Sequence, residues 1–137
     1  MLAIAAILAP EPKAATQELE RSVTITLQQA STQPLTLSEA ELYAGEWEVE
    51  PLPGTVIDTY ESSRYIMGTD DVSSLGGRIE FAPAAGGMII LQIEWSMDGR
   101  ALCSAESNSV EDLDVQTTLM NTDTLHPTCS VEVISTR

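Results

Sequence analysis

The sequence has few positive charges. Its 137 residues include 6 Lys plus Arg against 21 Asp plus Glu, which gives a net charge of −15. DNA and RNA binding needs clustered Lys and Arg that neutralise phosphates, so the composition argues against a nucleic-acid partner. An anionic bilayer would repel the protein for the same reason, and any membrane target should carry a neutral or zwitterionic headgroup. Acidity selects no function by itself, since many acidic proteins are charged merely to stay dispersed.

Residues for catalysis and metal binding are also scarce. His126 is the single histidine, and no Gly-x-Ser-x-Gly elbow or comparable triad signature is present. One His and two distant Cys give no zinc-ligand spacing, and no glycine-rich phosphate loop precedes a lysine. The acid clusters match no calcium loop and more simply keep strands from pairing edge to edge; they are Asp70-Asp71, Asp112-x-Asp114 and Glu46-x-Glu48-x-Glu50. We therefore expect no enzyme, no metal and no cofactor.

Cysteine is limited to Cys103 and Cys129, which is too few for a disulfide framework. The two form an even pair separated by strand-like sequence, and a bridge between them would contribute roughly 3 kcal/mol in the chain-entropy model. Alternatively, Cys129 heads the alternating run that ends at Ile134, where a buried free thiol packs as a small hydrophobe. The sequence leaves both readings open.

No long hydrophobic run is present. The apolar stretch from Met1 to Ala9 is too short to span a bilayer, and nothing positive precedes Lys13 as in a secretory signal. We expect residues 1–20 to form a short N-terminal arm, with a truncated signal as the alternative. Residues 21–137 are expected to form one domain.

What the chain does contain is a β-strand pattern. Val23, Ile25 and Leu27 alternate with polar residues, and short strand candidates separated by Gly, Pro and Asn turns continue to the end of the chain. No 3.6-residue period follows Glu20. This organisation predicts an all-β, single-domain antiparallel β-sandwich. The expected strands include Ser22–Gln28, Leu35–Leu37, Glu46–Glu50, Thr55–Tyr60, Arg78–Phe81 and Met88–Trp95, then Ala101–Glu106, Asp112–Leu119 and Cys129–Ile134.

Strand parity separates inner from outer residues. Trp47 and Val49 share one face of their strand and three glutamates share the other, so Trp47 is expected to be a core anchor. In the strand from Met88 to Trp95, one face is continuously apolar; it comprises Ile89, Leu91, Ile93 and Trp95. That strand is expected to be central.

The segment Tyr65-Ile66-Met67-Gly68 reads as an apolar loop between Arg64 and a polar run. Such a loop tip could enter the headgroup region of a membrane, where tyrosine suits the interface. It could equally fold down and cap the end of the sandwich.

Several of these segments together resemble a known family. In order, they are Ser22-Val-Thr-Ile-Thr-Leu27, Leu35-Thr-Leu37, Gly45-Glu-Trp47, Pro51 to Ile57, Tyr65-Ile-Met-Gly-Thr69, Gly76 to Phe81 and Ile89 to Trp95. Their order and spacing resemble the aegerolysins, particularly the bacterial members, over most of Arg21 to Cys103. No single motif carries the resemblance.

The resemblance implies a small, actinoporin-like β-sandwich that recognises membrane lipids such as sphingolipids or sterol-rich domains. It also implies a larger membrane-attack-complex/perforin partner, with which the protein would form a two-component cytolytic toxin. Several bacterial members belong to binary insecticidal toxins. The protein would then be secreted or released and act extracellularly on target membranes.

The chain departs from the family pattern where the lipid site is expected. The family's acidic Gly-Thr-Glu-Gly-like segment aligns either with Ser73 to Leu75 or with Asp70, and Ser96-Met97-Asp98-Gly99 replaces the usual proline and aromatic. The candidate lipid- or receptor-binding residues are Tyr60, Tyr65, Ile66, Met67, Asp70, Asp71, Trp95 and Asp98. The alternative is a lectin-like sandwich, in which Tyr43, Tyr60 or Tyr65 would stack on a sugar ring while Asp70 and Asp71 accept hydroxyl groups.

Overall fold

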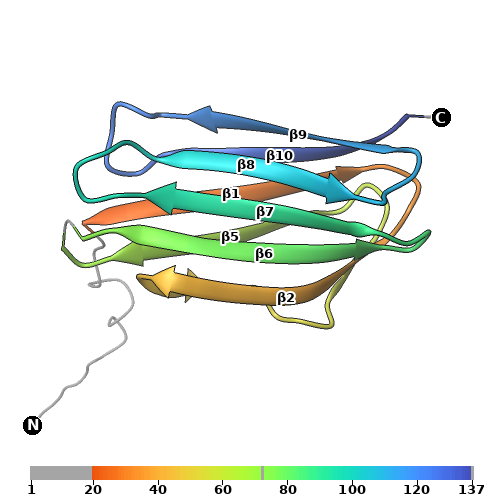
Figure 1. The fold of residues 1–137 in the computed structure, drawn as a ribbon, viewed down its shortest axis with the longest axis horizontal. Helices are drawn as coiled ribbons and strands as arrows, with labels where there is room; N and C mark the ends of the chain where they lie inside the picture. Colours follow the sequence, from red (N-terminus) through yellow and green to blue (C-terminus); the bar gives the residue numbers. More distant parts are fainter. Residues whose placement is uncertain (1–19, 72, 137) are drawn as a thin grey trace, which may run out of the picture.

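Ten β-strands form two five-stranded sheets in the computed structural model, which describes residues 20–71 and 73–136 (Figure 1). Within these residues there is no helix, and hence none of the length and hydropathy needed to cross a bilayer. The strands are β1 (Arg21–Ala30), β2 (Leu35–Ala44), β3 (Glu46–Val49), β4 (Val56–Ile57), β5 (Ser62–Thr69), β6 (Leu75–Pro83), β7 (Met88–Trp95), β8 (Leu102–Asn108), β9 (Leu113–Met120) and β10 (Thr128–Ser135).

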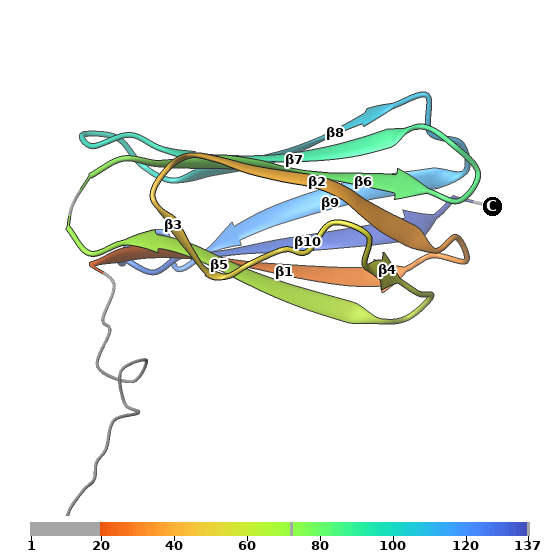
Figure 2. The ribbon, with the colours of Figure 1, turned by 90° about the horizontal axis from the view of Figure 1, so that it is seen from below.

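The two sheets lie face to face as two layers (Figure 2). Sheet A has the order β3-β5-β1-β10-β9, and sheet B has the order β4-β2-β6-β7-β8. The predicted β-sandwich is therefore confirmed. One pair differs from the antiparallel expectation, because β1 and β10 run parallel from Thr24 beside Thr128 to Ala30 beside Ile134. A parallel pair needs a long connection, and here the whole intervening chain supplies it.

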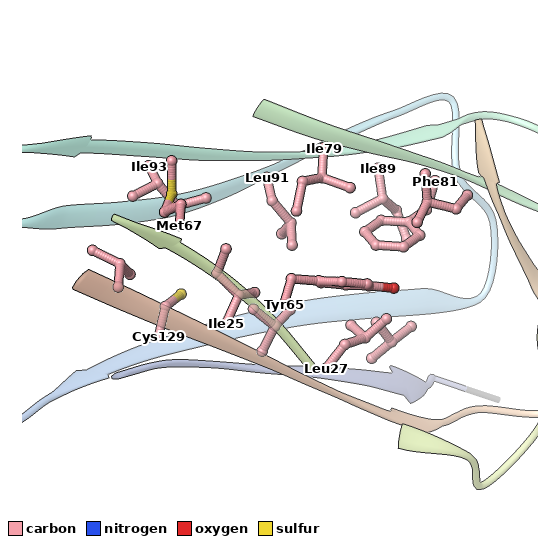
Figure 3. Packing of buried hydrophobic residues seen from close by; sticks show 14 of the residues in the cluster. Ile25, Leu27, Tyr65, Met67, Ile79, Phe81, Ile89, Leu91, Ile93 and Cys129 are labelled. Atoms are coloured by element: carbon pink, nitrogen blue, oxygen red, sulfur yellow. The ribbon is translucent and has the colours of Figure 1, made fainter. Parts of the chain in front are cut away.

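The core fills the space between the sheets (Figure 3). Val23, Ile25 and Leu27 of β1 face inward and are at most 1% exposed, as their alternation predicts. The apolar face of β7 lies opposite them, and β7 occupies an interior position in sheet B. Burying these side chains is the main favourable contribution to the stability of the sandwich.

The segment expected to be an exposed apolar loop is strand β5. It lies between β3 and β1, with Tyr65 beside Ile25 and Met67 beside Val23. Tyr65 is 6% exposed and Met67 is fully buried, and Figure 3 shows both side chains between the sheets. Ile66 faces outward and is half buried. The expectation of a loop tip at Tyr65–Met67 is wrong, because strands on both sides complete its backbone hydrogen bonds.

Strand β2 extends beyond the predicted Leu35–Leu37. The prediction was too short because the alternation of inward and outward residues changes parity after Leu37. A register shift lies between Leu37 and Glu39. Leu35 and Leu37 point inward before the shift, whereas Ala40 and Leu42 pack on the core after it. A β-bulge has this effect, since one extra residue on one strand reverses the facing of everything that follows.

Strand β3 also contains a register shift, which lies between Trp47 and Val49. Trp47 is half buried and packs against the margin of the core, whereas Val49 is 38% exposed. The expectation that both share one inner face is wrong for this reason. The predicted strand Thr55–Tyr60 is also shorter, since only Val56 and Ile57 pair with β2.

A disulfide between Cys103 and Cys129 joins the two sheets, with 6.2 Å between the Cα atoms. Cys103 belongs to β8 of sheet B and Cys129 to β10 of sheet A. The expected N-terminal arm, residues 1–20, lies outside the described residues apart from Glu20.

Candidate functional site

Three loops meet at the end of the sandwich where β1 begins, on the left of Figure 1. They join β5 to β6, β7 to β8 and β9 to β10, and we call this region the Arg21 end. Asp70, Asp71 and Asp98 lie in these loops and Trp95 lies at the adjoining end of β7. Tyr60 lies at the opposite end, between β4 and β5. Of the eight candidate contact residues, the structure therefore brings together four: Asp70, Asp71, Trp95 and Asp98.

Arg21 positions two of these loops. Its side chain is 7% exposed and lies over the ring of Trp95, with 4.5 Å from Cζ to the ring centroid. Nη1 donates to the backbone oxygens of Ser73, at 3.3 Å, and Ser96, at 3.2 Å, and Nη2 donates to that of Met97, at 3.0 Å. One guanidinium thus holds the β5–β6 and β7–β8 loops against each other by charge-assisted hydrogen bonds.

The third loop is attached to β1 by Ser22. Its backbone N–H donates to the carbonyl of Leu125, and its Oγ lies 2.8 Å from Nδ1 of His126. His126 therefore has a structural partner at this end. These contacts leave Leu125 partly exposed at the rim.

Asp71 shapes the β5–β6 loop. Its Oδ1 accepts hydrogen bonds of 2.9 Å from the backbone N–H of Ser73 and from Oγ1 of Thr69. Hydrogen bonding from the Ser73 side chain first, then from the Ser73 backbone N–H and from Thr69, lowers the pKa of the Asp71 carboxyl. The Asp71 carboxylate thus accepts hydrogen bonds from its own loop and stabilises the loop's conformation.

A groove of about 300 Å³ lies beside the Arg21 end on the outer face of sheet B. We call it the Tyr43 groove; it is lined by Tyr43, Ala44, Ser74, Leu75, Gly76, Glu94, Ser96, Arg100 and Leu102. Gly76 pairs with Ala44 on one side and Glu94 on the other, and Glu94 pairs with Leu102. Because Gly76 has no side chain, an open space is left between Tyr43 and Glu94.

The groove combines three kinds of contact. Tyr43 is 52% exposed and offers an aromatic surface, and Glu94 offers a carboxylate. Arg100 is exposed and has no ion-pair partner among the described residues. Such a set suits a ligand that carries both charges, since aromatic faces and carboxylates attract ammonium groups while guanidinium binds phosphate.

Arg78 lies beside this groove and is engaged within the protein. It forms an ion pair with Glu80. Glu80 is the main cause of the raised pKa of Arg78, and Tyr43 adds a smaller contribution of the same sign. Arg100 is therefore the guanidinium that remains available to a ligand in the groove.

Exposed apolar side chains gather near the same end. Of the nine large apolar residues exposed in the described part of the chain, five lie there or in the groove: Tyr43, Met97, Leu102, Met120 and Leu125. Tyr60, at the other end, is 70% exposed. Exposed apolar side chains around a polar groove are typical of binding surfaces.

Sequence reasoning missed Arg21, Gly76, Glu94 and Arg100. They come from three separate parts of the chain, since Arg100 lies in the loop that follows Glu94 and the end of β7. The sheet register places Gly76 beside Glu94. The scarcity of basic residues was the one available signal, since two of the six, Arg21 and Arg100, serve this end. Among residues 20–71 and 73–136, no group of three or more His, Cys, Asp or Glu side chains could hold a metal ion.

By sequence, neither a protein-family model nor a curated protein matches this chain. Solved structures share its fold. The crystal structure of the lipid-binding protein Nakanori is 12% identical, with a TM-score of 0.65, over 88% of this chain and 73% of that one. IP-1A from Alcaligenes faecalis is 13% identical, with a TM-score of 0.66, over 91% and 98% of the two chains. The Xerocomus chrysenteron lectin XCL is 10% identical, with a TM-score of 0.61, over 82% and 98%.

These likenesses agree with the aegerolysin-like fold that the sequence resemblance implies. At 10–13% identity they establish the architecture and leave the ligand to the residues of this chain.

Proposed function

We propose that the protein binds a membrane lipid with a zwitterionic headgroup through the Tyr43 groove. The observation that carries this proposal is the meeting of Tyr43, Glu94 and Arg100 in one groove beside exposed apolar loops. An ammonium group would lie against Tyr43 and Glu94, and a phosphate would pair with Arg100. The fold shared with the lipid-binding protein Nakanori supports the same ligand class.

The apolar loops would contact the bilayer while the groove holds the headgroup. Met97 and Leu125 would enter the interfacial region, where each methylene group that leaves water contributes about 0.8 kcal/mol. The net charge of −15 would keep the protein from anionic surfaces. The proposal also includes a preference for sphingolipid or sterol-rich zwitterionic membranes, which the aegerolysin resemblance implies.

We further propose that lipid binding serves a two-component pore-forming system. The protein would act extracellularly as a docking adaptor with no catalytic role, and a larger perforin-like protein would supply the membrane-inserting machinery. Binding to one lipid headgroup is weak, so a partner that holds several adaptors on one membrane would raise the overall affinity. The aegerolysin resemblance motivates this step.

Liposome co-sedimentation tests the lipid proposal. Vesicles of phosphatidylcholine with sphingomyelin, ceramide phosphoethanolamine or sterol should retain the protein, whereas phosphatidylserine vesicles should not. Dye release from the same vesicles, with and without the perforin-like product of a neighbouring gene, tests the second step. Lack of binding to every zwitterionic mixture would refute the lipid proposal, and binding without partner-dependent release would refute only the pore-forming role.

The glycan site was expected from Tyr43, Tyr60 or Tyr65 with Asp70 and Asp71, and the structure does not assemble it around Tyr60 or Tyr65. Tyr65 is buried, Tyr60 lies at the opposite end from the two aspartates, and Asp71 is bonded to its own loop. Of the three tyrosines, Tyr43 lines the groove described above.

A further inference from the structure

A second groove, of about 350 Å³, lies on the outer face of sheet A. We call it the Arg64 groove; it is lined by Thr26, Leu27 and Gln28 of β1, Ser62, Ser63 and Arg64 of β5, and Ser130 of β10. The register places Arg64 beside Thr26 and Ser62 beside Gln28, while Thr26 also pairs with Ser130. The three strands therefore present their outward side chains to one space, on a different sheet from the Tyr43 groove.

The lining is almost entirely hydroxyl, amide and guanidinium. Within the described residues, the side chains of Thr26, Gln28, Ser62, Arg64 and Ser130 have no hydrogen-bond partner in the protein. The polar side chains at the β1–β2 turn differ, because Gln29 and Ser31 bond each other and Gln33. The donors and acceptors of the Arg64 groove are therefore free to bind a ligand.

The charges around the Arg64 groove further limit the class of ligand that it could bind. Arg64 and Arg100 are the exposed arginines without an ion pair in the described part of the chain, and Arg64 is the single cation of this groove. Glu132, exposed beside Gln28, places a negative charge at the groove's margin. In a protein of net charge −15, one guanidinium balances a carboxylate, whereas a phosphate monoester carries nearly twice that charge.

We propose that the Arg64 groove binds a sugar that carries a carboxylate, such as a uronic or sialic acid residue of a glycan. Arg64 binds the carboxylate, in the bidentate geometry that guanidinium favours. The hydroxyls of Thr26, Ser62 and Ser130 and the amide of Gln28 bind the sugar hydroxyls. This site is separate from the lipid groove, and it does not depend on lipid binding.

Amide chemical shifts in a two-dimensional NMR spectrum test the proposal, with sodium glucuronate as the probe at millimolar concentration. Glucuronate should shift the amides of residues 26–28, 62–64 and 130, and glucose and sodium acetate should bind at least tenfold more weakly. The variant Arg64→Gln should weaken glucuronate binding tenfold or more, while the matched variant Arg100→Gln should leave it within twofold. The dispersion of each spectrum reports that each variant is folded.

Four results would overturn the proposal. If acetate binds as tightly as glucuronate, the groove is a simple anion site. If glucose binds as tightly as glucuronate, the carboxylate contributes nothing to binding. Unchanged glucuronate binding in Arg64→Gln, or shifts confined to the Tyr43 groove, would place the ligand elsewhere.

Discussion

The guanidinium of Arg21 lies over the indole ring of Trp95, 4.5 Å from its centroid, and donates to backbone oxygens of both loops that border the Tyr43 groove. One buried cation thus connects β1 of sheet A to the loop that enters sheet B and to the loop that joins β7 to β8 within sheet B. Ser96, which accepts one of these hydrogen bonds, lines the groove, although Arg21 itself does not.

Replacing Arg21 with Met should lower the free energy of unfolding by about 2 to 4 kcal/mol, because the cation–π contact and three charge-assisted hydrogen bonds are lost. Urea denaturation measures the change. The matched variant Arg64→Met removes an exposed arginine without an ion pair and should change stability by less than about 0.5 kcal/mol. Equal effects of the two variants would contradict the role given to Arg21.

The two neighbouring glycines of β6 should differ in how much stability they lose when replaced by alanine. A Cβ on Gly77 would lie 2.9 Å from the backbone oxygen of Glu41 and 3.0 Å from Cε of Met67, so Gly77→Ala should destabilise the fold by about 1 to 3 kcal/mol. A Cβ on Gly76 meets the Tyr43 ring at 3.6 Å, an ordinary contact, so Gly76→Ala should stay within about 0.5 kcal/mol. Thermal unfolding of the pair checks this, and a more damaging Gly76→Ala would show that the groove is already filled.

Reduction of the Cys103–Cys129 disulfide should lower the stability by about 3 to 4 kcal/mol, since the bridge closes a loop with a sequence separation of 26 residues. The expected drop in Tm is about 10 °C, measured by circular dichroism with and without dithiothreitol. Thiol titration provides the control, because the folded, unreduced protein should show no reactive thiol. Two reactive thiols before reduction would contradict the bridge.

The Tyr65 phenol should make the fold sensitive to alkali. Burial raises its pKa, and the Ser63 side chain lowers it to a smaller extent, although no hydrogen bond of ordinary geometry forms within the described residues. The unfolded chain then loses this proton at a lower pH than the folded chain. Stability from this group is therefore complete below pH of about 10 and is lost as pH rises through the folded-state pKa.

The variant Tyr65→Phe should remove this sensitivity. Because the hydroxyl is buried without a partner in the described structure, the change should be neutral or stabilise the fold by up to about 1 kcal/mol near pH 7. Denaturation midpoints at pH 8 and pH 11 measure both effects, and Tyr60→Phe, at an exposed tyrosine, is the control. A loss of more than about 2 kcal/mol in Tyr65→Phe would mean that the hydroxyl has a partner.

The β-sandwich could be predicted from sequence where each strand keeps one alternation throughout. Strands β1 and β7 do so, and Val23, Ile25, Ile89 and Leu91 lie in the core as expected. The bulges after Leu37 and Trp47 reverse the facing of later residues. A prediction from alternation alone therefore ended β2 too early and assigned Val49 to the inner face.

The candidate site was harder to predict because it depends on long-range register. Tyr65-Ile66-Met67 looked like a loop, since the pairing with β1 and β3 that makes it a strand is not visible in its own sequence. Tyr43, Gly76 and Glu94 meet only because β2, β6 and β7 are adjacent in sheet B. The candidate contact residues Trp95 and Asp98 lie at the Arg21 end, whereas Arg21, which organises that end, lies 74 residues before Trp95.

Binding of Gly76→Val and Arg100→Gln to sphingomyelin-containing vesicles tests whether the Tyr43 groove holds the lipid headgroup. The first variant fills the open floor of the Tyr43 groove and the second removes its free cation. If the groove holds the headgroup, the wild type and the control Arg64→Gln bind these vesicles alike. Both groove variants then bind at least tenfold more weakly while keeping the wild-type Tm within a few degrees. Equal binding by the wild type and both groove variants would contradict this role of the groove.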